Sequence, residues 1–445
     1  MDYTQFTEAD IREMLKAIGA DRVDDLFRDV PASQRLTRPL HIPAGLSEME
    51  LMADVRALAD KNTTCQELVC FLGGGAADHF VPAIVEELSS QAEFRTAYTP
   101  YQAEASQGSL QAFFEYQTML CQLTGMDVSN ASLYEQASAV AEAVLMARAV
   151  NKRSRVLVSR AVHPDSFTVL ETYLREQPVE LVRIDSEGGL TNLSALRDAV
   201  DERTAAVVVQ SPNFFGCIET LGEVVDAAHQ AGALAVAAVD PVSCGLLKAP
   251  GAFGVDIVVG EAQPLGIPLS YGGPYCGFLA AREEYLRKMP GRVVGVSHDG
   301  QGRRGFCLTL QTREQHIKRE RATSNICTNQ GLMALRVAVY LAAMGRQGVA
   351  KVASLCLDKA HYAAERIAAI PGYALRFQAP FFKEFVVRTD RDIRRVLDHC
   401  RTRKVLAGIP LECWHPDLAD CFLVTVTEKR TRQEIDSLVG ALASA

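Results

Sequence analysis

A loop rich in neutral hydrogen-bonding side chains, "TAYTPYQAEASQGSLQ" (96–111), contains the first candidate binding residues. Hydroxyl and amide groups gather there around one proline, just before an expected helix. Such groups can donate hydrogen bonds to a small polar ligand and accept them from it, and binding residues often lie on loops. An ordinary surface loop is the alternative interpretation. The candidate site residues in this loop are Thr96, Tyr98, Tyr101, Gln102 and Gln107.

Two more candidates follow apolar runs that are typical of buried strands. Asp240 stands in "VDPVSCG" (239–245), and His163 stands in "AVHPDS" (161–166). Open α/β sheets bind ligands at the carboxyl ends of their strands, so either side chain could reach a ligand. A purely structural role is the alternative for both.

The segment "ASLYEQAS" (131–138) predicts a helix start, because Ser132 and Glu135 have the spacing of a capping box. A helix N-terminus attracts anions such as phosphate. Here, however, Glu135 would place its own negative charge in the first turn, and Gln136 adds bulk where a phosphate would approach. The sequence therefore predicts a self-capped helix that binds no phosphate.

The segment "GEAQPLGIPLSYGGPYCGF" (260–278) follows a short apolar run. It resembles the part of pyridoxal-phosphate enzymes in which a lysine forms a Schiff base with the cofactor. It contains no lysine, and none occurs between Lys248 and Lys288; Gln263 stands about where that lysine would be. An amide has no nucleophilic amine and cannot form an imine. We predict that this chain alone carries out no Schiff-base chemistry.

Two further segments have more than one interpretation. The three glycines of "FLGGGAADHF" (71–80) allow close approach of other backbone, and they predict either a tight packing turn or a loop near an active site. The polar stretch "TSNICTNQ" (323–330) precedes a long helical pattern. It is expected either to pack at an interface or to border a site.

The elements that must position these residues alternate through the middle of the chain. Short Val-rich apolar runs separated by helical patterns predict a doubly wound, mostly parallel α/β sheet. The expected strands cover 155–159, 179–184, 205–210, 234–240 and 256–261, and the expected helices cover 166–175, 193–201 and 220–231.

This pattern divides the chain into three expected parts. Residues 1–65 contain helical stretches whose apolar faces are too small to close a core, so we expect an arm whose first helix is capped by Thr7 and ended by Gly19. Residues 66–345 are expected to form the large α/β domain. Residues 346–445 alternate strand and helix patterns and predict a smaller α+β domain.

The composition excludes several classes of function. The chain has 445 residues, a net charge of -8 and a pI of about 5.7, which argues against nucleic-acid binding because that requires a basic field. No apolar run approaches the roughly 20 residues of a membrane helix, and the acidic start lacks a secretion signal, so we expect a cytoplasmic protein. The twelve cysteines show no CxxC and no zinc spacing, which predicts reduced thiols and no metal site.

Taken together, the quoted segments resemble the glycine cleavage system P-protein family in its two-subunit form. The resemblance covers nearly the whole chain, and its most specific segments are "FLGGGAADHF", "GEAQPLGIPLSYGGPYCGF" and "LQTREQHIKRERATSNICTNQ". It implies the fold-type-I architecture of pyridoxal-phosphate transferases and the position of α subunit, or subunit 1. In this family the β subunit carries the lysine and the cofactor, and the α subunit binds no cofactor.

The resemblance also implies a reaction and partners. The two subunits would pair as α2β2, decarboxylate glycine, release CO2 and pass the aminomethyl group to the lipoyl arm of the H-protein, with the T- and L-proteins as indirect partners. The 96–102 loop, with Thr96, Tyr98, Tyr101 and Gln102, is expected to face the shared active site or its access channel.

Four positions of a cofactor site would then be vestigial in this chain. Glu135 lies at the phosphate turn, His163 where a histidine stacks on the ring, Asp240 where an aspartate pairs with the ring nitrogen, and Gln263 where the lysine stands.

The chain departs from the family pattern at two places. Tyr134-Glu135-Gln136 stands where Tyr-Asp-Gly is expected, and Ala77 stands where an aromatic residue is expected. Three alternative functions remain: a scaffold or regulatory pseudoenzyme without glycine turnover, an autonomous pyridoxal-phosphate enzyme, and a decarboxylase subunit for another amino acid.

Overall fold

The computed structural model describes residues 5–96 and 98–445, and the chain divides into one unit that ends at Thr63 and a second unit, Thr64–Ala445. The first four residues of the acidic start, and Ala97 in the candidate loop, lie outside the described residues. The first unit contains the helices α1 (Glu8–Ala17) and α2 (Glu48–Ala59). The Thr7 side chain caps α1, and Gly19 follows it with a φ of +70°, so both predicted ends of this helix are confirmed.

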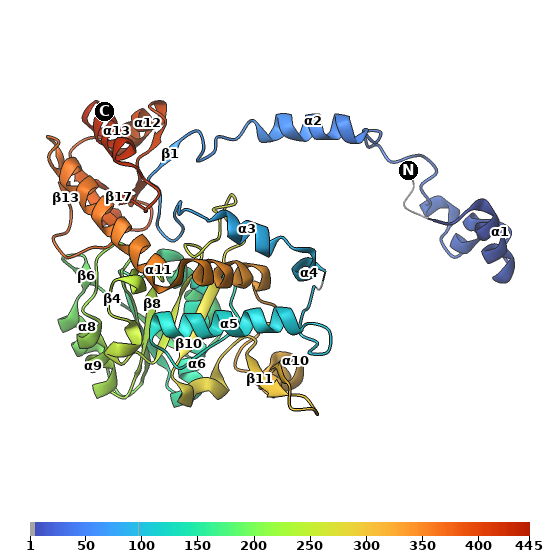
Figure 1. Cartoon of the computed structure of the whole chain (residues 1–445), viewed down its shortest axis with the longest axis horizontal. Helices are drawn as coiled ribbons and strands as arrows, with labels where there is room; N and C mark the ends of the chain where they lie inside the picture. Colours follow the sequence, from blue (N-terminus) through green and yellow to red (C-terminus); the bar gives the residue numbers. More distant parts are fainter. Residues whose placement is uncertain (1–4, 97) are drawn as a thin grey trace. The chain divides into compact units, whose positions relative to one another are not determined.

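The second unit contains a seven-stranded sheet of order β2-β10-β9-β8-β7-β3-β4 (Figure 1). Five neighbouring strands run parallel, whereas β10 is antiparallel to both of its neighbours. The five parallel strands are the five that the sequence predicts. The bounds are β2 (Val128–Ser129), β3 (Arg155–Ser159), β4 (Glu180–Ile184), β7 (Thr204–Gln210), β8 (Leu234–Val239), β9 (Ile257–Glu261) and β10 (Gly277–Ala281).

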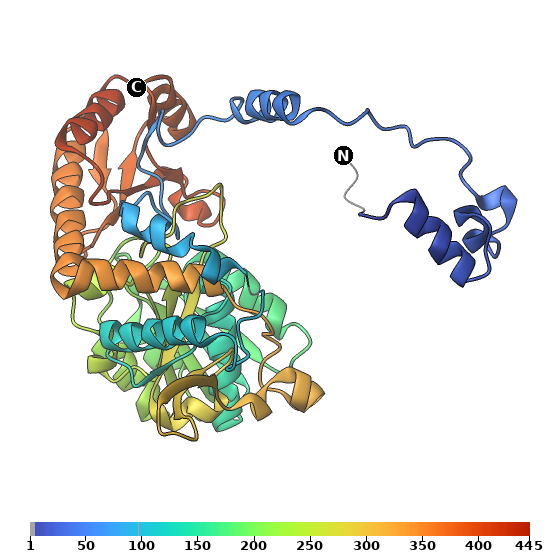
Figure 2. The ribbon, with the colours of Figure 1, turned by 45° about the vertical axis from the view of Figure 1, so that its right-hand side comes forward.

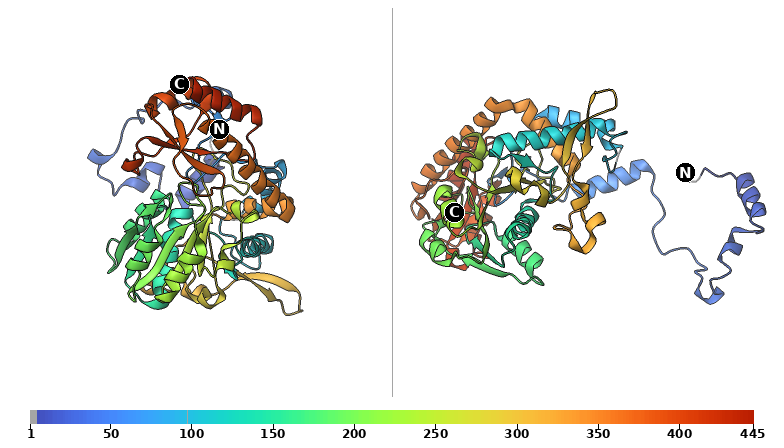
Figure 3. Two further views of the ribbon diagram at one scale, coloured as in Figure 1. Left: turned by 90° about the vertical axis from the view of Figure 1, so that its left-hand side faces the viewer. Right: turned by 90° about the horizontal axis from the view of Figure 1, so that it is seen from below.

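Helices cover both faces of this sheet (Figure 3), and the sheet separates two hydrophobic cores. On β8, Val236 packs into the core under α6 and α7, while Ala235 and Ala237 pack into the core under α5 and α9. This is the alternation that a β-strand imposes on successive side chains. The bounds are α5 (Gln107–Thr124), α6 (Gln136–Asn151), α7 (Pro164–Leu174), α8 (Leu193–Ala199) and α9 (Leu221–Gln230).

A smaller lobe follows the long helix α11 (Gly331–Ala368), which bends at Gly345 (φ +58°, ψ -179°). Figure 2 shows one limb of α11 along each lobe. The predicted domain boundary at 345/346 falls inside this element, at its bend. The lobe has an antiparallel sheet of order β13-β14-β17-β16. The bounds are β13 (Tyr373–Leu375), β14 (Glu384–Thr389), α12 (Ile393–Thr402), β16 (Ile409–Pro410), β17 (Cys421–Thr425) and α13 (Arg432–Ala443).

The second unit begins at the small lobe and crosses to the large one. Strand β1 (Val69–Cys70) pairs with β15 (Val405–Leu406), and the glycine-rich segment 73–79 then leads to α3 (Ala83–Ser89) and α4 (Ala92–Arg95). The hairpin of β11 (Val294–His298) and β12 (Arg304–Leu308) projects from the large lobe (Figure 3). Among the described residues, no helix combines the length and the apolar character needed to cross a bilayer.

Candidate functional site

The carboxyl end of β8 meets the small lobe at a very small cavity. Its volume is about 40 Å³, and its walls come from the glycine-rich segment, the start of α6, the ends of β8 and β9, and the residues before β14. Small-molecule pockets usually measure about 300–1,000 Å³. The cavity is therefore too small for an aromatic cofactor. The lining side chains that matter below are Gln136, Gln210, Asp240, Glu261 and Lys383.

Lys383, just before β14, occupies the space next to Asp240. Its Nζ lies 2.8 Å from Asp240 Oδ2 and 2.9 Å from His79 Nε2. Burial is the largest single influence and by itself lowers the pKa of the Lys383 ammonium, but the facing Asp240 carboxylate together with Cys356 and Glu384 outweighs it, and the pKa is raised. The other oxygen of Asp240 accepts a hydrogen bond from the Val242 N–H at 3.0 Å. Asp240 is thus paired with a cation from its own chain.

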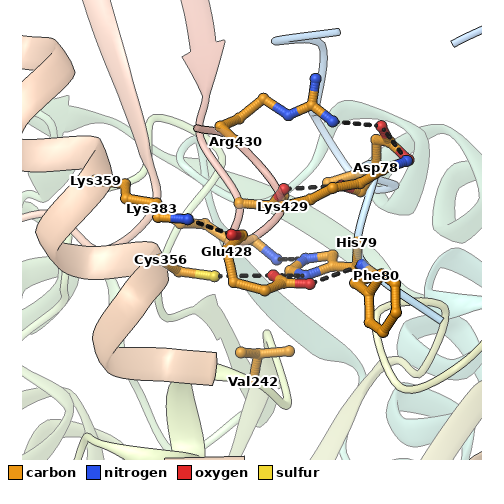
Figure 4. A network of polar contacts seen from close by, with 12 residues as sticks. Asp78, His79, Phe80, Val242, Cys356, Lys359, Lys383, Glu428, Lys429 and Arg430 are labelled. Carbon is orange, nitrogen blue, oxygen red and sulfur yellow. Dashed lines mark hydrogen bonds and ion pairs between the residues drawn. The ribbon is translucent and has the colours of Figure 1, made fainter. Parts of the chain in front are cut away.

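The ammonium belongs to a buried polar network that joins the two lobes (Figure 4). An ammonium only donates, so His79 accepts at Nε2 and donates from Nδ1 to Glu428 Oε2 at 2.7 Å. The same carboxylate accepts from the Phe80 N–H at 2.7 Å and from the Cys356 thiol at 3.3 Å. Burial would raise the pKa of Glu428, but its contact with His79 and these further donors hold the pKa at about 2.

Next to this network, Asp78 ties the glycine-rich segment to the residues that follow β17. Its carboxylate lies 2.7 Å from Lys429 Nζ and 2.9 Å from Arg430 Nη2. Earlier in the glycine-rich segment, the Gly74 N–H donates a hydrogen bond to the Glu384 carboxylate at 2.9 Å. Because a Cβ at Gly73 would lie 1.8 Å from the Thr425 hydroxyl oxygen, the glycines serve tight packing between the lobes. Gly75 also lines the small cavity. The packing interpretation is confirmed, and the interpretation as a loop near an active site stays a prediction.

The potential metal ligands His79, Cys356 and Glu428 have donor atoms within 4.8 Å of one another. The Lys383 ammonium, however, already binds the same imidazole. Burial also raises the pKa of the Cys356 thiol well above its ordinary value, which keeps the sulfur protonated, whereas metals bind the thiolate. The arrangement favours a hydrogen-bonded network over a metal centre.

Helix α6 starts three residues later than the predicted capping box implies. Its first residue is Gln136, so Glu135 is the N-cap residue and its side chain accepts from the Ser138 N–H at 2.8 Å. The predicted Ser132–Glu135 capping box is therefore wrong: the Ser132 hydroxyl instead accepts from the Gln330 N–H. The reason is that the chain reaches helical geometry only after Ser132, whose φ is +136°. The helix is still capped by its own chain, as predicted.

A second carboxylate, that of Glu261 at the end of β9, lies at the same helix start. It accepts hydrogen bonds from the backbone N–H groups of Gln263 and Cys276 at 2.9 Å, and of Gln136 at 3.4 Å. Burial raises the pKa of Glu261 to about 7 despite these bonds. Two acidic side chains therefore use the amide donors that would otherwise attract an anion.

Gln263 is almost completely buried and is held at both ends of its amide. Its Oε1 accepts from the Ala77 N–H at 3.0 Å, and its Nε2 donates to the carbonyl oxygens of Ala77 at 3.1 Å and Ile267 at 2.8 Å. Ala77 is thus bound through its backbone. His163 is also fixed: its Nε2 lies 2.6 Å from the Gly74 carbonyl oxygen, and its Nδ1 accepts from the Asp165 N–H.

The candidate loop borders a separate and much larger cavity of about 510 Å³. Thr96, Tyr98 and Tyr101 line it, and Asn329 and Gln330 from the polar stretch before α11 line it too. The Tyr101 hydroxyl donates to Asn329 Oδ1 at 2.8 Å. The structure thus brings together two segments that the sequence singled out separately, and the polar stretch borders a cavity.

The two glutamines of the loop are placed differently from its tyrosines. The Gln107 amide donates to the Phe306 carbonyl oxygen and accepts from the Phe306 N–H, both at 2.8 Å, so it anchors the β11–β12 hairpin. Gln102 is exposed, and its carbonyl oxygen accepts from Ala105 and Ser106 in the turn before α5. Neither side chain is among those that line the described cavity.

Comparison with known proteins identifies the family. The family model described as glycine cleavage system P-protein matches residues 1–442. The chain belongs to the glycine cleavage system P-protein family. It is 52% identical over 444 residues to the "Probable glycine dehydrogenase (decarboxylating) subunit 1" of Desulforamulus reducens, covering 100% of both chains. It also matches a crystal structure of an inhibitor-bound glycine decarboxylase (P-protein), at 43% identity and a TM-score of 0.92 over 100% of each chain.

A more distant structure shows the fold alone. A C-DES mutant with glycine covalently linked to its pyridoxal-phosphate cofactor has a TM-score of 0.63 at 14% identity, over 86% of this chain and 99% of that one. The predicted pyridoxal-phosphate fold is thereby confirmed. In this P-protein chain, however, the residues do not fit the cofactor: Lys383 neutralises Asp240, acidic side chains take the amides of α6, and Gln263 is bonded to Ala77.

The residues that fill the site were not among those predicted from the sequence. Lys383 stands inside the apolar run "PFFKEFVV" (380–387), and a lysine is almost never fully buried unless it is paired. That rule would have indicated a buried anion as its partner. It could not have named Asp240, because the two residues meet only when the small lobe packs on the end of β8.

Proposed function

We propose that this chain is the cofactor-free α subunit of a two-subunit glycine decarboxylase, the P-protein of the glycine cleavage system. The observation that carries the proposal is a pyridoxal-phosphate fold in which the Lys383 ammonium pairs with Asp240 at the carboxyl end of β8. Relatives that are named as subunit 1 support it. They favour it over a scaffold without glycine turnover, over an autonomous enzyme and over a decarboxylase for another amino acid.

The proposal assigns the missing chemistry to a partner chain. A β subunit of similar fold carries the lysine and pyridoxal phosphate, and the subunits pair as α2β2. Together they decarboxylate glycine, release CO2 and transfer the aminomethyl group to the lipoylated H-protein, with the T- and L-proteins as indirect partners. A cytoplasmic location fits the twelve free thiols, which are typical of a reducing compartment.

Within this assembly the cavity beside the candidate loop is the part of this chain that we assign to the shared active site or its channel. It is large enough for a small ligand, and neutral donors and acceptors line it together with Arg95. Tyr98 is 92% exposed, so its ring is available to a partner. The walls of such a cavity exclude water from a reacting centre, and Thr96, Tyr98 and Tyr101 supply hydroxyl groups that orient the glycine or the lipoyl arm.

The first test replaces Tyr98 and Tyr101 by phenylalanine in the reconstituted αβ complex. Loss of the two hydroxyls is expected to lower glycine–CO2 exchange and transfer to the H-protein by about tenfold or more, since each lost hydrogen bond is worth roughly 0.5–1.5 kcal/mol. Tyr362→Phe is the matched control, because that hydroxyl binds Asp436 on the small lobe. Unchanged exchange and transfer in the double variant would refute the assignment of the loop.

The second test asks whether the isolated chain takes the cofactor. Purified alone and mixed with pyridoxal phosphate, it is expected to show no imine absorbance and no release of CO2 from glycine. The complex with the β subunit is expected to show both. Imine formation by the isolated chain would overturn the proposal.

A further inference from the structure

A buried carboxyl group that the proposed function does not use lies inside the large lobe. Glu142, on the second turn of α6, is 2% exposed, and its Oε2 atom makes no hydrogen bond with any described residue. Burial raises the pKa of Glu142 to about 7, although the Ser324 side chain acts in the opposite direction. Buried polar atoms almost always have a partner, and a buried charge is costly without one. The bare oxygen of Glu142 therefore points to a ligand.

Glu142 lines a cavity of about 330 Å³ whose walls come from α6, α7 and the polar stretch before α11. The side chains of Tyr134 and Tyr173 line it as well, and both also pack on the core beneath α6 and α7. The volume lies at the low end of the range for small-molecule pockets, and it exceeds the space that a bare metal ion needs. The other lining residues are Leu145, Gln177, Asn325 and Ile326.

The chemistry of these walls favours a cation. The described lining residues include no lysine, arginine or histidine, so Glu142 supplies the charge of the cavity. The carboxylate also acts on the opposite wall, because the pKa of the Tyr173 phenol is raised chiefly by burial and next by Glu142. Aromatic faces attract cations, and the two tyrosine hydroxyl groups can accept hydrogen bonds from one.

The same walls distinguish an organic cation from a metal ion. Ca²⁺ takes roughly six to eight oxygen ligands, several of them usually carboxylates, whereas a single carboxylate lines this cavity. Leu145 lies one helical turn after Glu142 on the same face of α6, and Ile326 adds a second apolar side chain to the lining. These two side chains are suited to a short alkyl group beside a positive charge.

We propose that this cavity is a binding site for a small organic primary ammonium, whose charged end pairs with Glu142 and whose alkyl part contacts Leu145 and Ile326. An ammonium only donates hydrogen bonds, so it supplies the donor that Glu142 Oε2 can accept. The site shares one wall with the larger cavity beside the candidate loop, because Tyr134 lines both. Binding concerns this chain alone, so the proposal holds or fails independently of the two-subunit function.

Isothermal titration calorimetry of the full chain with n-butylammonium chloride, at constant ionic strength, tests the proposal. The wild type is expected to bind the amine. Glu142→Gln is expected to weaken binding by about tenfold or more, because the amide keeps the shape of the side chain but not its charge. The matched control Glu171→Gln removes an exposed carboxylate on α7 and should change the affinity by about twofold or less. Equal binding by the wild type and Glu142→Gln, or no binding by the wild type, would overturn the proposal.

The pH dependence of binding supplies a second readout. An alkylammonium stays charged at pH 8, as lysine does, whereas Glu142, with a pKa of about 7, is mostly ionised at pH 8 and mostly protonated at pH 6. The affinity is therefore expected to fall about tenfold from pH 8 to pH 6. The other titratable groups of the lining, Tyr134 and Tyr173, are phenols, which titrate near about pH 10 in model compounds. An affinity that is independent of pH, or that changes equally in Glu142→Gln, would contradict the pairing.

Two further probes and a second variant define the ligand class. Sodium n-butyrate, which has a similar size and the opposite charge, is expected not to bind, and potassium chloride is expected not to compete with the amine. Leu145→Phe fills part of the apolar end without changing the carboxylate, and it is expected to weaken binding of n-butylammonium about fivefold or more. This variant keeps the proposal testable if Glu142→Gln folds poorly. Binding of butyrate, displacement of the amine by potassium, or unchanged affinity of Leu145→Phe would overturn the assignment.

Discussion

Replacement of Lys383 by methionine tests whether an internal ion pair holds the former cofactor site together. The side chains of Lys383 and Asp240 are 6% and 16% exposed, and their charged atoms are 2.8 Å apart. Removal of one partner of a buried pair leaves the other charge uncompensated and costs about 3–5 kcal/mol. Methionine keeps most of the aliphatic stem, so the loss is mainly that of the charge. We expect the free energy of unfolding to fall by about 3 kcal/mol, at the low end because water reaches Asp240.

A double-mutant cycle separates the pair from the individual side chains. Asp240→Asn alone is also expected to destabilise, because the buried Lys383 ammonium then loses the carboxylate charge that faces it. The variant Lys383→Met/Asp240→Asn is expected to be more stable than the sum of the single effects predicts, by about 2 kcal/mol, since neither charge is left unpaired.

Urea unfolding is a suitable assay because the chain has one tryptophan. Trp414 packs edge-on against Phe214, with ring centroids 5.7 Å apart, where the lobes meet, so its fluorescence reports on the joined lobes. Lys351→Met, at an exposed position on α11, is the control and should change stability by about 0.5 kcal/mol or less. The reasoning would be refuted if Lys383→Met lowered the free energy of unfolding by less than about 1 kcal/mol, or if the effects of Lys383→Met and Asp240→Asn simply added in the double variant.

Three other predictions follow from single positions. Burial lowers the pKa of the His415 imidazole from 6.5 to about 4. Below pH 6.5 the imidazole therefore takes up a proton in the unfolded chain but not in the folded one, and the free energy of unfolding falls by about 2 kcal/mol between pH 7 and pH 5. The variant His415→Phe should remove this contribution from the pH dependence of the urea midpoint, and an unchanged pH dependence would contradict the assignment. The variant Gly73→Ala should lower the melting temperature and the free energy of unfolding, the latter by at least about 2 kcal/mol, because the new Cβ would lie 1.8 Å from the Thr425 hydroxyl oxygen. The control Gly108→Ala should be tolerated, because a Cβ there meets nothing within 4 Å. The variant Gln263→Lys should still give no imine absorbance with pyridoxal phosphate, because the adjoining positions stay filled, and a new imine band would show that the site is open. Its free energy of unfolding should fall by about 1–3 kcal/mol, because buried backbone groups lose their hydrogen-bond partners.

Local patterns in the sequence predicted a large part of the architecture. The five parallel strands follow from Val-rich runs that alternate with helices, and the ends of α1 follow from Thr7 and Gly19. The predicted start of α6 was wrong. The Ser132 hydroxyl does not cap the helix but accepts a hydrogen bond from the backbone N–H of Gln330, which is far away in the sequence. The antiparallel strand β10 was not predicted either, since strand direction depends on pairing with β9.

The sequence by itself determined which side chains stand at the candidate positions. No lysine stands in the segment around Gln263, and the absence of an amine from a position is a property of the residues alone. Only the tertiary structure decided what fills the site instead. Lys383 and Glu428 come from the small lobe, Asp240 comes from the large lobe, and His79 comes from the segment that connects them. A buried charge selects its partner by distance and desolvation in the folded chain. For the same reason, the cavity beside Tyr98 and Tyr101 is visible only in three dimensions.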